Sequence, residues 1–185
     1  MIKRNYYKIV RIFPDPSSYF YIKNEAMSNN DIGIFTFNPE KLNELNLDYS
    51  LDKVNWTRVT EYSNNVLVPA DGYMYLRNTT GIFNTYSTQI FTPHNDISLG
   101  GDIRTLFNYT DVDSVTKIPD YGFYEPFSFQ EDSKCIDISN LSFRGITEIG
   151  NYGLSGAFGY HFMTTKGVDL RGITTLGEGA LNSLY

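Results

Sequence analysis

The sequence has little cysteine and histidine, and each shortage excludes a class of protein. Cys135 is the one cysteine among 185 residues, so no internal disulfide framework can form. We expect its thiol to be a small buried hydrophobic group rather than a reactive one. The two histidines, His94 and His161, do not combine with it in the spacing of a zinc site. No run approaches the roughly 20 apolar residues that a membrane span needs, so no membrane contact is predicted.

Neither sign of charge is concentrated anywhere. The 15 Lys and Arg against 21 Asp and Glu give a formal net charge of −6, and the basic residues are scattered. This distribution excludes the electrostatic footprint of a nucleic-acid-binding protein. Asp111 and Asp113 lack the further ligands of a calcium loop. Gly100-Gly101 lacks the strand and lysine of a phosphate-binding loop, and no nucleophile motif occurs. We therefore predict no metal, no cofactor and no catalysis.

What the sequence does have is aromatic residues, 15 Tyr and 13 Phe, which favour strands. Short strands are predicted at 32–37, 47–51 and 55–59. The runs 66–68 and 73–77, separated by a turn with Gly72, have the signature of a β-hairpin. Together these strands predict a small β-sandwich-like domain over residues 26–110. Near its end, a short helix over 103–107 is predicted with Asp102 as its cap.

Residues 111–135 carry an irregular, aromatic pattern that we interpret as a connector. Pro119 and Pro126 interrupt it, and no strand period is visible. Such an aromatic cluster covers the edge of a core or forms a binding surface. We take it as the candidate recognition surface, made of Tyr121, Phe123, Tyr124, Phe127 and Phe129.

An internal repeat occupies the C-terminal part, residues 136–185. The segment 141–158 aligns without a gap on 168–185, so that Arg144-Gly145-Ile146-Thr147 matches Arg171-Gly172-Ile173-Thr174 at an offset of 27 residues. That period falls in the roughly 20–29-residue range of leucine-rich repeats. Apolar residues at fixed offsets form ladders when such copies stack. The alternative is a chance similarity in a Gly-rich sequence.

This pattern resembles the BspA-like leucine-rich repeats of bacterial surface proteins. The upstream half is similar to the module that often precedes such repeats: Leu47 to Asp52 with Trp56-Thr57, then Tyr73 to Arg77, then Ile97 to Leu106 match its motifs in order. The period of 27 is longer than usual for this repeat type. The resemblance implies a mainly β chain, a small β-sandwich-like N-terminal domain followed by a leucine-rich-repeat-type solenoid of at least two repeats, used for adhesion or display in bacterial and bacteriophage surface proteins.

The first 25 residues lie outside this resemblance. Their pattern bears on whether the protein is secreted or belongs to a phage particle. Lys8, Arg11 and Pro14 interrupt any continuous apolar run, so we read no secretory signal there. A virion protein needs none, and the expectation is therefore a bacteriophage head fibre, tail fibre or appendage. The alternatives are a bacterial cell-surface adhesin and a carbohydrate-binding module.

We expect the segment 1–25, with strands at 7–13 and 19–23, to dock on other virion proteins or on sister chains in a homo-oligomer. Its candidate contact residues are Tyr6, Tyr7, Ile9, Ile12 and Phe13. The other end, at Tyr185, shows no polar cap, and we expect the array to continue beyond it. A host-surface receptor or glycan would be the outer partner.

Overall fold

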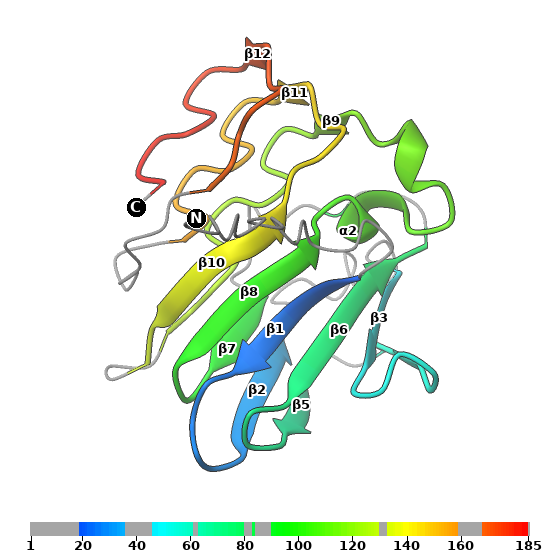
Figure 1. Ribbon diagram of the computed structural model, residues 1–185, viewed down its shortest axis with the longest axis vertical. Coiled ribbons are helices and arrows are strands. Elements are labelled where there is room, and N and C mark those ends of the chain that lie inside the picture. The colour runs from blue at the N-terminus through cyan, green and yellow to red at the C-terminus, as the bar shows by residue number, and fades with distance from the viewer. Residues whose placement is uncertain are drawn as a thin grey trace, which may run out of the picture.

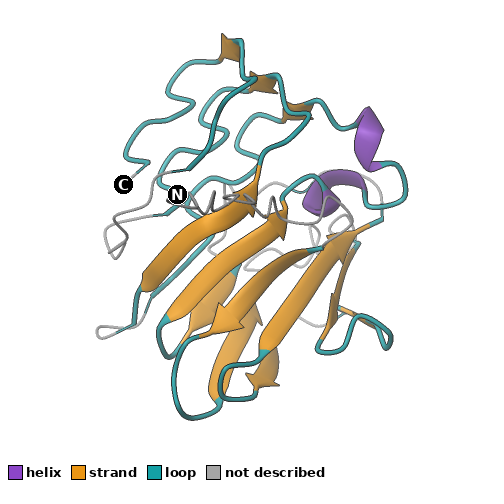
Figure 2. Ribbon diagram, viewed as in Figure 1, coloured by secondary structure: helices purple, strands orange, loops and turns teal. Residues whose placement is uncertain are grey.

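The computed structural model describes residues 19–35, 46–60, 63–79, 83, 90–129, 133–158 and 168–184. Over these ranges the chain is mainly β, as the sequence predicts, and its sheets are of mixed direction (Figure 2). The helical segments described are short: α2 (Thr105–Asn108) and the 3-10 helix η1 (Val112–Ser114). Among the described residues, no helix is long and apolar enough to cross a membrane.

The largest sheet has six strands, most of them antiparallel to their neighbours. Its exception is β10, which runs parallel to β8. From one edge to the other the strands are β10 (Cys135–Ser142), β8 (Ile97–Asp102), β1 (Phe20–Asn24), β6 (Tyr73–Asn78), β3 (Leu47–Ser50) and β4 (Thr57–Arg58). We call this the front sheet, because it faces the viewer in Figure 1.

A three-stranded antiparallel sheet lies behind it (Figure 1). Alternate side chains of both layers point into the space between them. Phe20 and Ile22 of the front sheet are 0% exposed, and Ile32 and Ile34 of the back sheet are at most 1% exposed. The strands of this back sheet, in order, are β5 (Ser63–Val68), β2 (Asn30–Phe35) and β7 (Phe91–Pro93).

The position of β1 corrects the predicted domain boundary at residue 25. β1 lies between β8 and β6 inside the front sheet and pairs with both. The backbone N–H of Phe20 also donates to the hydroxyl of Thr105, at 2.9 Å. Residues 20–24 are therefore part of the core rather than of a separate docking segment. The strand itself was predicted, but as half of a local hairpin instead of a central strand.

The predicted hairpin over residues 66–77 is wrong. β5 belongs to the back sheet and β6 to the front sheet, so the turn between them carries the chain from one layer to the other. The Gly72 N–H donates to the Pro69 carbonyl at 2.9 Å and closes that turn. Val68 and Met74 on its two sides are both fully buried. Alternating apolar strands around a turn fit either arrangement, and the sequence could not distinguish them.

A third sheet stands beyond the end of the front sheet (Figure 1). It consists of two-residue parallel strands, β12 (Thr175–Leu176), β11 (Glu148–Ile149) and β9 (Lys117–Ile118). Between β8 and β9 lies α2, which begins after Arg104 and has no side-chain cap. The prediction that Asp102 caps this helix is wrong: its carboxylate accepts the backbone N–H of Arg104, the residue before the helix, at 3.0 Å and binds the Arg104 guanidinium at 2.7 Å.

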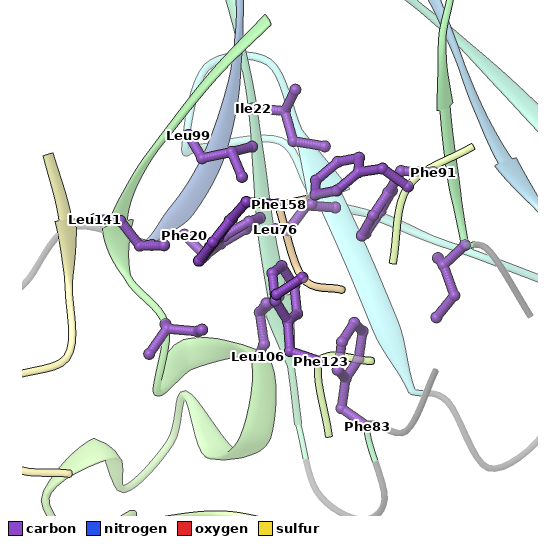
Figure 3. Close-up of a cluster of buried hydrophobic side chains, with 14 of the residues drawn as sticks. Phe20, Ile22, Leu76, Phe83, Phe91, Leu99, Leu106, Phe123, Leu141 and Phe158 are labelled. Carbon is purple, nitrogen blue, oxygen red and sulfur yellow. The ribbon is translucent and has the colours of Figure 1, made fainter. Parts of the chain in front are cut away.

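One hydrophobic core connects the layers with the third sheet (Figure 3). The ring of Phe123, which follows β9, lies 5.7 Å from that of Phe20 in β1. The ring of Phe158, which follows β11, lies 6.4 Å from Phe123. These phenylalanines are at most 1% exposed. The segments that carry the repeat are therefore packed onto the sheets and are not a separate unit.

Candidate functional site

Three turns of chain, each beginning at a threonine, stack on one another around β9, β11 and β12 (Figure 1). The Thr147 N–H donates to the Thr116 carbonyl at 2.8 Å, and the Thr174 N–H donates to the Thr147 carbonyl at 2.8 Å. Their hydroxyls follow the same path, at 3.3 Å in both cases. The turns occupy residues 116–127, 147–158 and 174–184, which places them 31 and then 27 residues apart.

The return half of each turn is joined by bonds that run in the opposite direction, from the earlier turn to the later one. The first turn donates from Tyr121, Phe123 and Glu125, at 2.9, 2.9 and 3.0 Å, to the carbonyls of Asn151, Gly153 and Ser155. The second donates from Tyr152, Leu154 and Gly156, at 2.8, 2.9 and 2.9 Å, to those of Glu178, Ala180 and Asn182. The same pattern thus joins both pairs of turns.

The backbone bends at matching positions in the three turns. Tyr121, Tyr152 and Gly179 have φ of 55°, 53° and 60°. Four residues further on, Glu125, Gly156 and Ser183 have φ of 39°, 59° and 48°. At the first bend only the third turn has glycine, and at the second bend only the second turn has it. The spacing of glycines therefore does not reveal these bends. Matching backbone geometry with different residues explains why the first turn escaped sequence comparison.

The first turn is the one that the sequence reading missed. Within the predicted connector 111–135, residues 116–127 form a turn with the same hydrogen bonds and left-handed bends as the other two. The signal that could have found it is Thr116-Lys117-Ile118-Pro119, aligned on Thr147-Glu148-Ile149-Gly150 at the unexpected offset of 31. The four residues by which this offset exceeds 27 lie between the first and second turns, within 128–146, and they interrupt the period.

The candidate recognition surface is not one surface. Phe123 is 0% exposed and Phe127 is 8% exposed, so both belong to the core and cannot contact a partner. Their burial follows from the turn, in which Phe123 and Phe127 face the core and Tyr124 and Glu125 between them face outward. Tyr121 and Tyr124 are half-buried, and Tyr121 stacks on Tyr152 with 5.3 Å between centroids. Phe129 is also half-buried and stacks on Phe127.

The two ends of the stack differ. The N–H groups of Gly150 and Gly177 each donate 2.8 Å bonds to the turn before them, and Pro119 at the same position has no N–H to donate. Proline is typical of such an edge. At the other edge, Leu176 of β12 is 54% exposed, although its equivalent Ile149 is fully buried. The stack is therefore blocked on the side of β9 and open on the side of β12.

The segment between β3 and β4, which contains Asp52 and Trp56, forms a rigid loop. The Asp52 carboxylate accepts bonds from the backbone N–H groups of Val54 and Asn55, at 2.8 and 2.7 Å. These bonds hold the pKa of Asp52 far below its usual range. The loop places Trp56 on Arg77, whose guanidinium carbon lies 3.9 Å from the indole centroid.

The predicted docking residues Tyr6, Tyr7, Ile9, Ile12 and Phe13 lie outside the described part of the chain. In the described ranges, no group of three or more His, Cys, Asp or Glu side chains gathers where it could hold a metal ion. Comparison with known proteins gives no family model, no curated protein and no solved structure that matches this chain.

Proposed function

We propose that this chain is a structural and attachment protein of a bacteriophage particle, part of a head fibre, tail fibre or similar appendage. In this proposal the stacked turns form a leucine-rich-repeat-type solenoid, carried by a β-sandwich-like module. The observation that supports it best is the repeated hydrogen-bond pattern at 31 and 27 residues. Such an array extends by adding equivalent turns and offers an elongated surface, which suits display and adhesion.

The particle location rests on the resemblance to bacterial and phage surface proteins. A bacterial cell-surface adhesin is the alternative, because the same stacked turns would serve it equally well. Both roles are non-enzymatic, and in both the chain would act in a homo-oligomer or beside other surface proteins. The two candidates differ in where the protein is found, which a direct measurement can decide.

The test is peptide mass spectrometry on density-banded phage particles and, separately, on the washed host envelope. We expect peptides of this chain in the particle band at a fixed ratio to the major capsid protein. Peptides confined to the envelope fraction would overturn the virion assignment and favour the adhesin. Mock lysates of uninfected cells, banded in the same way, are the control for co-sedimenting envelope fragments.

The N-terminal docking role can be tested in the same particles. A truncation that removes residues 1–18 leaves β1 (Phe20–Asn24) intact, which a deletion through residue 25 would not. We expect the truncated protein to fold, as judged by circular dichroism, and to be absent from banded particles. Normal incorporation of the truncated protein would show that docking uses another part of the chain.

A further inference from the structure

The front sheet has an outer face that carries tyrosines instead of apolar residues. In β1 and β6 the inward residues Ile22 and Met74 are fully buried, so their neighbours point to the opposite side. Tyr21, Tyr73 and Tyr75 stand on that outer side. In Figure 1 it faces the viewer, and no described element crosses in front of β1 and β6. The back sheet covers only the inner side.

The three rings form one group. Tyr73 and Tyr75 are nearly parallel, with 10° between their planes and 5.8 Å between centroids. Tyr21 meets both edge-on, at 5.3 Å and 6.2 Å. The ammonium of Lys53 lies 4.5 Å from the centroid of Tyr75 and holds that ring in place. Tyr73 is the most open of the three and is 37% exposed.

A glycine in the neighbouring strand lets Tyr21 lie down on the sheet. Gly100 of β8 pairs with Tyr21, and a Cβ at Gly100 would lie 2.2 Å from the Tyr21 hydroxyl and 2.3 Å from its Cζ. The far end of the ring therefore occupies the space that any other residue would fill. The three tyrosines therefore extend from β6 across β1, and the Tyr21 ring reaches over Gly100 of β8.

Carboxylates offset the cations around these rings, although Lys53 itself contacts only the Tyr75 ring in the interactions described above. Lys23, next to Tyr73 in register, binds Glu25 at 2.9 Å and Asp71 at 2.7 Å. Arg77, further along β6, binds Asp48 at 3.1 Å. Beside the rings, Lys23 and Lys53 face three carboxylates, those of Glu25, Asp71 and Asp137, so the face offers no net positive charge to an anionic ligand. The surface therefore fits an uncharged partner better than a nucleic acid or an acidic polymer.

Polar residues lie beside the three rings, on the side of the front sheet that carries β10. Ser98 of β8 pairs with Lys23 on one side and with Asp137 on the other. It is only 7% exposed, and its hydroxyl has no hydrogen-bond partner among the described residues. Because that oxygen is itself covered, it is not available to a ligand, and the half-buried Asp137 is the polar group at this edge. Burial also raises the pKa of Tyr21 to about 12, so that this phenol stays a neutral donor.

We propose that this face, made of Tyr21, Tyr73 and Tyr75 with Gly100 beside them, is a binding platform for a neutral glycan. Sugars combine an apolar C–H face with hydroxyl groups, and aromatic rings bordered by hydrogen-bonding groups match both. The proposal deepens the attachment role and rests on it only for its biological meaning. It also places the recognition surface on the outer face of β1 and β6 instead of at residues 121–129.

The experiment presents the purified chain to a printed array of neutral, sialylated and uronic-acid glycans. The best neutral glycan is then titrated as a free oligosaccharide by calorimetry. Tyr73→Ala removes the most open ring without touching the core. Gly100→Ala keeps every ring but places a methyl group where the Tyr21 ring lies. Tyr152→Ala, a half-buried tyrosine on the stacked turns, is the matched control.

We expect Tyr73→Ala and Gly100→Ala each to weaken binding roughly tenfold, as loss of one aromatic contact does. Tyr152→Ala should bind as the unchanged protein does, and Tyr73→Phe should bind within about threefold of it, because the ring is kept. Binding of no neutral glycan, preference for the acidic glycans, or equal losses in the control would overturn the platform. These results are independent of particle mass spectrometry, so either proposal can fail alone.

Discussion

Replacing equivalent apolar residues in the second and third turns should have very different effects on stability. Ile149 of β11 is fully buried, whereas Leu176, at the same position in β12, is 54% exposed. Ile149→Ala removes a buried side chain that neighbouring turns cover on both sides, which costs about 3 kcal/mol of unfolding free energy. Leu176→Ala should cost about 1 kcal/mol or less, because about half of that side chain is already in water.

Urea denaturation measures this difference directly. With a slope of about 2 kcal/mol per molar urea, Ile149→Ala lowers the midpoint by about 1.5 M and Leu176→Ala by about 0.5 M or less. The single Trp56 reports on the β3–β4 loop, and far-UV circular dichroism reports on the sheets, so coincident curves show one cooperative transition. Equal shifts for the two variants would refute the stacking order, because they would place both side chains in equivalent surroundings.

Three further predictions concern single positions elsewhere in the chain. Gly101→Ala should lower the unfolding free energy by more than about 2 kcal/mol, because φ is +80° and the new Cβ would lie 2.0 Å from the Tyr19 carbonyl oxygen. Gly172→Ala, with φ +101° but no atom closer than 3.9 Å to the new Cβ, should lower it by about 1 kcal/mol in the same urea assay. Similar losses for the two variants would contradict the close approach at Gly101. The lowered pKa of Asp52 stabilises the fold above the ordinary carboxyl pKa, and this stability is lost as pH falls toward the folded-state pKa. Asp52→Asn should therefore weaken the pH dependence of the urea midpoint between pH 5 and pH 3. A pH dependence equal to that of the unchanged protein would be evidence against the loop bonds. Burial raises the pKa of the Cys135 thiol, so a thiol reagent should label it only after unfolding, whereas labelling of the native protein at the rate of a free thiol would contradict its burial.

Local patterns in the sequence were sufficient to find the described strands before residue 80 and the mainly β class, but not β7, β8 or β10. Alternating apolar residues identified β1, β2, β3 and β6 close to their observed bounds. They could not assign partners, because a strand such as β5 buries Val66 and Val68 equally well in either layer. The predicted hairpin failed for that reason, and β1 was assigned to the wrong unit.

The repeat was found only where the period was regular. Two turns share Arg-Gly-Ile-Thr and an offset of 27, but the first turn has Pro119 in place of glycine and lies 31 residues before the second. Its identity depends on hydrogen bonds between segments, which no single-sequence pattern contains. The aromatic residues 121–129 looked like a surface, and the same bonds turn Phe123 into the core.

The outer face of the front sheet could not have been found from the sequence. Tyr21 and Gly100 are separated by most of the N-terminal half of the chain, and only the pairing of β1 with β8 brings them together. Tyr73 and Tyr75 show the period of a strand, but the sequence does not say which face of β6 is covered. Once the pairing of β1, β6 and β8 is known, the three rings follow from strand alternation.

The measurement that tests the central claim most directly is immunogold electron microscopy of intact phage particles with antibodies raised against the purified chain. The attachment-protein account predicts gold at one fixed site on the particle surface, and particles that lack the gene product should stay unlabelled. Gold found only on host envelopes, with bare particles in the same field, would contradict a virion role and leave the cell-surface adhesin as the function of the stacked turns.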